Sequence, residues 1–226
     1  MGVCPFFGVM SLCSLIYEVI SNPAGEKGIL MDFKEYKFLV YSDLYRITGT
    51  VNISTLIRHI LKGEAYKYIF WMRTCYYTRS KPVLKYSIYP FSRIILNHLM
   101  YKYGISIDPC TKIGSGFYIG HFGGIVVNDQ SVIGKNCNMS HGVTVGQANR
   151  GKNKGYPMLG DNIFIGPGAK IVGAIKIGNN VAIGANCVVT KDIQDNSVVV
   201  GIPGRVISLK GSKGYVNRTD YEDRIS

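Results

Sequence analysis

Cysteine motifs are missing from this sequence. Its six cysteines in 226 residues are widely spaced and form no C-x-x-C pair. That distribution excludes the crowded framework of a small disulfide-stabilised protein, and it offers no zinc-binding motif. We therefore expect reduced thiols, a cytoplasmic protein and no metal site. Cys137 and Cys187 occupy the same position of a repeat in the second half of the chain, which favours small buried side chains over ligands.

Acidic residues are also scarce. The chain has 14 Asp and Glu against 26 Lys and Arg, a formal net charge of +12, and residues 65–107 contain seven basic residues but no acidic one. This surplus favours an anionic partner, such as cofactor phosphates, lipid headgroups or nucleic acid. Because no nucleic-acid-binding motif is present, nucleic acid is not expected. The basic, aromatic-rich stretch either suits peripheral contact with the inner face of a membrane or forms a helical layer with buried aromatics and solvated cations, which is the commoner arrangement.

A recognisable secretory signal is lacking as well. The first twenty residues are mostly apolar, but no basic start or small-residue cleavage site accompanies them, and Glu18 interrupts the run. The run is too short for a comfortable membrane-spanning helix, which needs about 20 apolar residues. Residues 1–30 are therefore expected to be an apolar N-terminal extension. It either results from a start codon upstream of Met31 or lies on a membrane surface.

Helical periodicity follows this extension. Apolar residues recur every three or four positions in residues 53–61, 66–77 and 82–100, a spacing that predicts helices. Pro82 stands where a helix can begin, and Gly63 and Gly104 stand where helices can end. Residues 31–104 are expected to form a helical N-terminal domain, in which His59 and His98 have structural roles.

After Gly104 the apolar period changes to six. Each hexad predicts one short strand and one corner, so three hexads make a triangular coil whose aliphatic side chains point inward and whose stacking forms the core. Glycines and asparagines share one corner position, where left-handed backbone is needed. The thirteen aliphatic positions are Ile107, Ile113, Ile119, Ile125, Ile133, Met139, Val145, Leu159, Ile165, Ile171, Ile177, Ile183 and Val189. Residues 105–206 therefore predict a parallel β-solenoid, followed by a tail over residues 207–226.

Two insertions and two histidines mark the candidate site. Extra residues interrupt the hexads at 127–130 and at 146–158, and in a solenoid such residues loop outward. His121 and His141 each follow a hexad aliphatic residue by two positions, one coil apart, so we expect them to stack beside both loops. A neutral imidazole is suited to accept a proton near pH 7, which makes His121 and His141 the candidate catalytic residues.

Three stretches of residues 105–206 resemble the left-handed β-helix acetyltransferases, above all the serine O-acetyltransferases and the capsule or colanic-acid acetyltransferases. They are KIGSGFYIGHFGGIVV (112–127), HGVTVG (141–146) and VGIPGRVI (200–207). The resemblance implies a mainly β fold, a left-handed parallel β-helix (hexapeptide repeats) preceded by a small all-α N-terminal region. It also implies acetyl-CoA as co-substrate, a homotrimer with active sites between neighbouring prisms, and His121 as general base.

The same resemblance assigns a coenzyme site. It would be lined by Gly146, Gln147, Ala148, Pro167, Ala185, Lys191 and Arg205, with the last two able to pair with phosphates. The sequence contains no serine nucleophile elbow and no cysteine paired in sequence with a histidine. Direct transfer of the acetyl group between bound substrates is therefore preferred to an acyl-enzyme.

The sequence departs from the serine enzymes where their acceptor binds. Ser106 and Gly120 stand where those enzymes have aspartates, and Gly155 and Tyr156 stand where they have an Arg-His pair. A neutral sugar hydroxyl, held by hydrogen bonds, would suit a site made of Asn128, Asp129, Tyr156 and His141. The first hypothesis is thus O-acetylation of a sugar or polysaccharide precursor. The alternatives are serine O-acetylation in cysteine biosynthesis and a non-catalytic trimeric scaffold.

Overall fold

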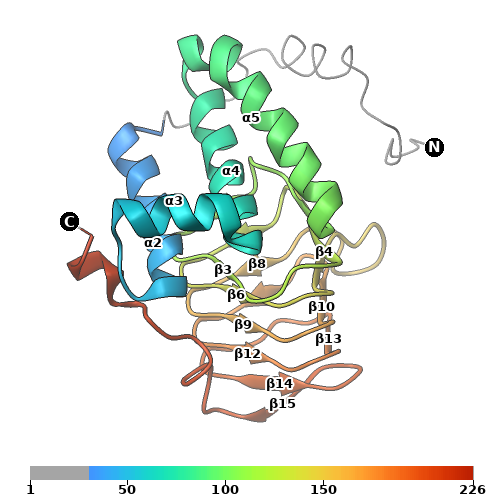
Figure 1. Ribbon diagram of the computed structural model, residues 1–226. Coiled ribbons are helices and arrows are strands. Elements are labelled where there is room, and N and C mark those ends of the chain that lie inside the picture. Colours follow the sequence, from blue (N-terminus) through green and yellow to red (C-terminus); the bar gives the residue numbers. More distant parts are fainter. Residues whose placement is uncertain (1–30, 226) are drawn as a thin grey trace.

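Helices cover one end of a triangular solenoid in this protein. The computed structural model describes residues 31–225, so the extension predicted over residues 1–30 lies outside the described residues. Figure 1 shows the four helices above the stacked coils, with the C-terminal segment returning toward them. The helices are α2 (Phe33–Thr48), α3 (Ile53–Lys62), α4 (Glu64–Arg79) and α5 (Pro82–Tyr103).

Local sequence signals set the ends of these helices. The side chains of Asp32 and Asn52 cap α2 and α3 by accepting hydrogen bonds from backbone N–H groups three residues later. Gly49 and Gly104 end α2 and α5 in the left-handed conformation, with φ of 72° and 60°. Pro82 begins α5, and the helices predicted over 53–61, 66–77 and 82–100 are confirmed as α3, α4 and α5.

The hexads form three sheets, one on each face of a left-handed prism, and all their strands are parallel except the final β15, which is antiparallel to β14. One sheet has the order β1-β4-β7-β10-β13, the second β11-β8-β5-β2 and the third β15-β14-β12-β9-β6-β3. All thirteen hexad aliphatic residues point into the prism and are 8% exposed or less. The strands are β1 (Ile105–Ile107), β2 (Lys112–Ile113), β3 (Tyr118–Ile119), β4 (Ile125–Val127), β5 (Val132–Ile133), β6 (Asn138–Met139), β7 (Thr144–Gly146), β8 (Met158–Leu159), β9 (Phe164–Ile165), β10 (Lys170–Val172), β11 (Lys176–Ile177), β12 (Ala182–Ile183), β13 (Val188–Val189), β14 (Val198–Val200) and β15 (Arg205–Ser208).

One corner of the prism carries a ladder of asparagines. Asn136, Asn162, Asn180 and Asn196 all have φ between 55° and 59°, a region that asparagine enters more readily than most residues. Each of the first three donates a side-chain N–H to the side-chain amide oxygen of the next, over 2.9 to 3.1 Å. The corner residues therefore both permit the turn and join successive coils.

A buried ion pair attaches the helices to the solenoid. Arg73 of α4 donates to the carboxylate of Asp43 in α2 over 2.9 Å and to the backbone oxygens of Ile113 and Gly114 over 2.7 Å. The same carboxylate accepts the N–H of Phe117. Arg73 is only 5% exposed, which corrects the expectation that the cations of this stretch stay solvated, because an acidic partner from α2 lies beside it.

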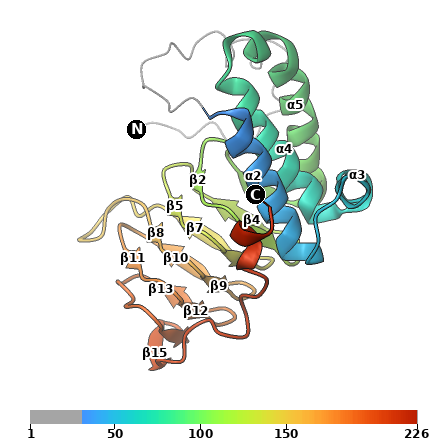
Figure 2. The same cartoon turned by 90° about the vertical axis from the view of Figure 1, so that its left-hand side faces the viewer.

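The C-terminal tail returns along the third sheet. β15 pairs antiparallel with β14, and the chain then runs back toward α2 (Figure 2). On the way, the ring of Tyr215 stacks on Phe164 with centroids 4.6 Å apart. The short helix η1 (Asp220–Asp223) buries Tyr221, whose hydroxyl lies 2.9 Å from that of Ser115. The tail thus links the last coil to the helical end.

Candidate active site

Two exposed histidines stack on one edge of the prism. His121 lies at the corner between β3 and β4, and His141 occupies the same corner one coil further, between β6 and β7. Their ring centroids are 6.1 Å apart and the rings meet edge to face at 73°. The spacing reflects parallel strands about 4.8 Å apart that carry side chains from equivalent positions. The two imidazoles can therefore face the same substrate.

Further coils continue the same corner, which we call the histidine edge and define by His121, His141, Pro167 and Ala185. Pro167 follows Ile165 and Ala185 follows Ile183 by the two positions that separate each histidine from its own hexad residue. The carbonyl of His141 accepts the N–H of Gly168 over 2.9 Å, and the carbonyl of Pro167 accepts that of Asn186 over 2.8 Å. An elongated ligand could follow this edge away from the helices.

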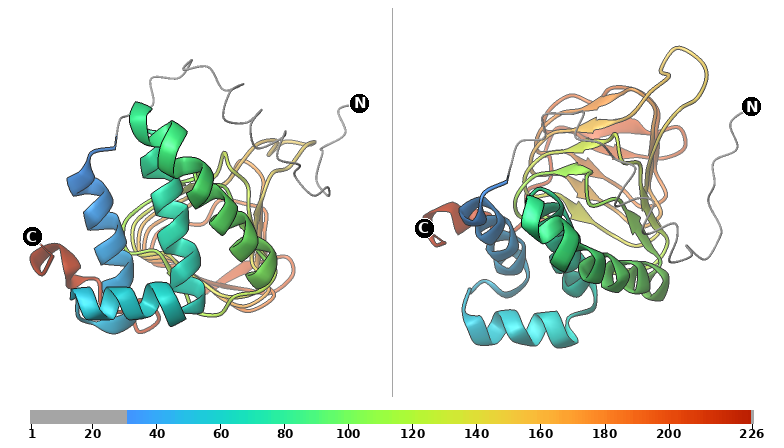
Figure 3. Two further views of the ribbon diagram at one scale, coloured as in Figure 1. Left: turned by 45° about the horizontal axis from the view of Figure 1, so that its top comes forward. Right: turned by 90° about the horizontal axis from the view of Figure 1, so that it is seen from above.

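The other predicted residues mostly lie on a second edge, which we call the loop edge. It joins the first sheet to the second and is formed by Asn128, Asp129, Gly146, Gln147, Ala148, Tyr156 and Lys191. The long loop between β7 and β8 projects here (Figure 3). Arg205 belongs to neither edge, because it begins β15 beside Val200 of β14 on the last coil.

Hydrogen bonds hold the long loop in shape. Ala148 and Gly155 exchange two backbone hydrogen bonds of 3.0 Å across it. Asn153 accepts the N–H of Ala174 and donates its side-chain amide to the carbonyl of Thr190, each over 2.8 Å. The loop is polar and surface-exposed, but these hydrogen bonds attach it to the later coils. Tyr156, at the end of the loop, is 37% exposed.

One chain does not bring the two edges together. They bound opposite sides of the β1-β4-β7-β10-β13 sheet, and Gln147 follows His141 by six residues. At a rise of about 3.3 Å per strand residue, the edges are roughly 20 Å apart. The expectation that the histidines lie beside the long loop is therefore wrong within one chain. His141 is likewise separated from Asn128, Asp129 and Tyr156.

Glycines and an aromatic contact shape the turn after His121. Gly123 and Gly124 have φ of 111° and 65°, and a Cβ on Gly123 would meet no heavy atom within 4 Å. The turn is open to a ligand, and its backbone can be approached closely. The next residue after His121, Phe122, packs on Tyr103 at the end of α5 with ring centroids 4.9 Å apart. Sequence reasoning missed Tyr103, because only tertiary packing brings it to this corner.

A lysine also lies near the histidine edge. Lys170 of β10 donates its ammonium group to the carbonyl oxygen of Gly142, the residue after His141. Lys170 is paired in register with Thr144 across the sheet, and its side chain is partly buried. Counting hexads places Lys170 in this sheet. The hexad pattern does not distinguish it from other outward-facing lysines, so the sequence does not identify it as a site residue.

No carboxylate orients either histidine within residues 31–225. No hydrogen bond or ion pair joins their rings to an Asp or Glu there, and Ser106 lies in β1 opposite Val126 of β4. Sterics do not exclude a side chain at Gly120, because a Cβ would come no closer than 3.5 Å to the ring of Tyr118. The lack of an aspartate is thus a property of the sequence and not of the available space.

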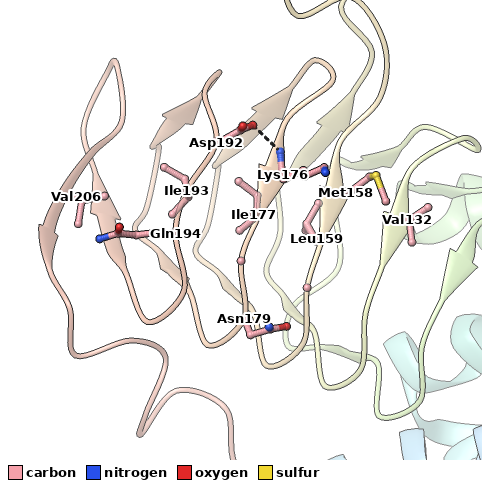
Figure 4. Close-up of a pocket in the computed structure, with 12 residues that line it drawn as sticks. Val132, Met158, Leu159, Lys176, Ile177, Asn179, Asp192, Ile193, Gln194 and Val206 are labelled. Carbon is pink, nitrogen blue, oxygen red and sulfur yellow. Dashed lines mark hydrogen bonds between the residues drawn. The ribbon is translucent and has the colours of Figure 1, made fainter.

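A groove lies on another face of the prism. Figure 4 shows it on the outer surface of the second sheet, where Val132, Met158 and Lys176 are among the lining residues. Its volume is about 720 Å³. The carboxylate of Asp192 accepts the backbone N–H of Lys176 there, over 2.8 Å. This sheet does not border the histidine edge, so this groove and the histidines are separate features.

The fold and its repeats define a left-handed parallel β-helix protein with an α-helical N-terminal region. The family described as "Bacterial transferase hexapeptide (six repeats)" matches residues 156–191. Over these residues the chain resembles this hexapeptide-repeat family. Within residues 31–225, no cluster of three or more histidine, cysteine or acidic side chains could hold a metal, and no helix combines the length and apolarity needed to cross a membrane.

The chain is similar to proteins named serine acetyltransferase. It is 40% identical over 144 residues to one from Bacillus pumilus, covering 63% of this chain and 66% of the relative, and 37% identical over 135 residues to one from Synechococcus elongatus, covering 60% and 52%. The chain thus spans about half to two thirds of the length of these relatives.

Solved structures show the same likeness. Serine acetyltransferase from Brucella abortus in complex with coenzyme A has a TM-score of 0.64 and 25% identity, covering 78% of this chain and 69% of that chain. Isoform 3 from Entamoeba histolytica in complex with cysteine has a TM-score of 0.58 and 32% identity, covering 74% and 58%.

Proposed function

We propose that this protein is an acetyl-CoA-dependent O-acetyltransferase that transfers the acetyl group directly to an acceptor hydroxyl. The observation that carries the proposal is the pair of exposed, stacked histidines on an edge whose later coils offer Pro167 and Ala185 to an extended coenzyme. The similarity to serine acetyltransferases, one of them solved with coenzyme A, supports the same chemistry.

In the proposed reaction His121 acts as general base. Its neutral imidazole takes the proton of the acceptor hydroxyl while that oxygen attacks the thioester carbonyl. The new C–O bond forms, the C–S bond breaks, and the thiolate of coenzyme A leaves and recovers the proton from the imidazolium. The open turn at Gly123 and Gly124 allows backbone N–H groups to approach the developing oxyanion. His141 lies close enough to orient the ring of His121 or to share the role.

We further propose a homotrimer in which the histidine edge of one protomer meets the loop edge of its neighbour. The roughly 20 Å between the edges in one chain supports this arrangement. A neighbouring prism would supply Tyr156, Gln147 and Lys191 opposite His121. The coenzyme would then lie between two prisms, with Lys191 and Arg205 available to its phosphates.

L-Serine is the acceptor that we propose first, because the curated relatives carry the name serine acetyltransferase. The product, O-acetylserine, would feed cysteine biosynthesis. A second candidate is a neutral sugar hydroxyl in a polysaccharide precursor. It is favoured by Ser106 and Gly120, which leave the histidines without carboxylates, and by Gly155 and Tyr156, which offer no cation to an amino-acid carboxylate.

Thiol release distinguishes these acceptors. Purified protein is mixed with acetyl-CoA, and free coenzyme A is measured with L-serine and, separately, with neutral hexoses and nucleotide sugars. Turnover with serine alone supports serine acetylation and excludes the sugar hypothesis, whereas turnover with a sugar alone does the reverse. The absence of acceptor-dependent release across this set, from protein that binds coenzyme A in a separate assay, would favour a non-catalytic trimeric scaffold.

A cytoplasmic location with peripheral attachment to the inner face of a membrane also stays a proposal. The exposed apolar residues Val83, Tyr86 and Ile94 of α5 support attachment of this kind.

A further inference from the structure

Helix α5 is apolar on the side that faces away from the protein. Its inner side buries Tyr89, Leu96, Leu99 and Tyr103 together with Ser92. At 3.6 residues per turn, the opposite side carries another apolar row. This outer row consists of Val83, Tyr86, Ile94 and Tyr101, which are 80%, 70%, 50% and 69% exposed. We call it the outer face of α5. Phe91 lies at its margin, because its ring packs edge to face on Trp71 of α4 with centroids 6.3 Å apart.

Helix α5 is apolar on two opposite sides, with polar residues such as Arg93 and Lys102 between them, and an apolar side of a helix is normally covered. The packing accounts for only one side, because α5 packs against α4 and β1. The outer row extends over most of the helix from Val83 to Tyr101, and scattered surface residues do not produce such alignment. Single exposed apolar residues need no explanation, but several on one side of a helix, with only Ser87 and His98 among them as exposed polar residues, indicate that something binds there.

The charge near the outer face identifies the kind of partner. Residues 65–107 include no acidic residue. The ammonium of Lys85 lies 5.7 Å from the ring centroid of Tyr86, and that of Lys102 lies 5.6 Å from the ring centroid of Tyr103. Lys81 directly precedes the helix, and its ammonium lies 5.9 Å from the ring centroid of Tyr77. By helical spacing Arg93 and Lys102 flank the outer face on its two sides, so this apolar strip is bordered by positive charge.

A second copy of the chain is a poor occupant, since pairing two such faces would bring like charges together. An anionic bilayer offers both an apolar layer and negative headgroups, which is the environment of interfacial helices rich in lysine and aromatic residues. Because α5 has 22 residues, it can lie about 33 Å along a surface. We propose that the outer face of α5 docks the protein on an anionic lipid bilayer.

Docking through α5 has a consequence for the candidate active site. The last residue of α5, Tyr103, contacts Phe122, the neighbour of His121. The C-terminal end of the docked helix therefore lies next to the histidine edge. If the proposed acetyl transfer holds, this arrangement suits an acceptor hydroxyl carried on a lipid. The docking itself does not depend on the activity, and its test measures binding alone.

Vesicle flotation tests the docking. The full chain is mixed with phosphatidylcholine vesicles with or without one third phosphatidylglycerol, and the floated fraction is measured at low and high salt. We expect flotation with anionic vesicles only, lost at high salt because surface charges are then screened. The variant Tyr86→Glu/Ile94→Glu should lower the partition coefficient at least tenfold. The matched control Ile207→Glu, at a residue 63% exposed on β15, should bind like the wild type.

Two measurements keep the outcome interpretable. Circular dichroism melting checks that each variant is folded, and Ile94→Glu alone serves if the double variant is not. Light scattering gives the oligomeric mass without vesicles. The proposal is overturned if the wild type does not float with anionic vesicles, if the outer-face variants float equally well, or if they lower the oligomeric mass, which would make a second copy the occupant.

Discussion

Replacing Arg73 by methionine is expected to destabilise the protein strongly. The substitution removes the ion pair with Asp43 and the hydrogen bonds to the carbonyls of Ile113 and Gly114, while the carboxylate stays 0% exposed. Leaving one buried charge without its partner costs about 3–5 kcal/mol. With an m-value of about 2 kcal/mol per M urea, the unfolding midpoint should fall by roughly 2 M.

The control is a lysine–glutamate ion pair at the surface. Lys135 and Glu222 approach to 2.6 Å, but their side chains are 52% and 56% exposed. Lys135→Met should therefore change the free energy of unfolding by no more than about 1 kcal/mol. Urea unfolding followed by circular dichroism measures both variants. If Arg73→Met cost less than about 1 kcal/mol, the view that this pair joins the helices to the solenoid would be refuted.

Two further predictions concern the solenoid. Burial raises the pKa of the Cys137 thiol to about 12. At pH 8 its thiolate should therefore be about a thousandfold scarcer than that of an ordinary cysteine. Iodoacetamide labelling, mapped by mass spectrometry, should modify Cys137 only after denaturation, and rapid labelling of the native protein would contradict this. Gly116→Ala should lower the melting temperature, because the φ of Gly116 is 70° and an added Cβ would lie 2.5 Å from the Asn136 amide oxygen. Gly120→Ala, whose Cβ would have no contact closer than 3.5 Å, should melt within a few degrees of the wild type. Equal melting temperatures of the two variants would refute this prediction.

The repeating part of the fold was predictable because its information is local. A hexad specifies a strand, a buried aliphatic residue and a corner within six residues, so every hexad position from Ile107 to Val189 is buried. The corner asparagines were identifiable for the same reason, since left-handed backbone limits the choice of residue. The stacking of His121 and His141 follows from counting coils.

Features that join distant segments could not be obtained in this way. The partners Arg73 and Asp43 are 30 positions apart on different helices, and no period links them. The contact of Phe122 with Tyr103 depends on how α5 approaches β1. The long loop is adjacent to His141 in sequence, yet the triangular cross-section puts the two on different edges. Which residues share an edge is set by the number of strands between them and not by nearness along the chain.

The central claim is that His121 performs acetyl transfer as a general base. The most direct test measures the rate of coenzyme A release from acetyl-CoA with the acceptor that the wild-type protein uses. The wild type is compared with His121→Ala and with the control His98→Ala, at an exposed residue of α5. We expect His121→Ala to lose about 10²–10⁴-fold in kcat, while His98→Ala stays within twofold of the wild type. A His121→Ala protein that is folded and as active as the wild type would contradict the account.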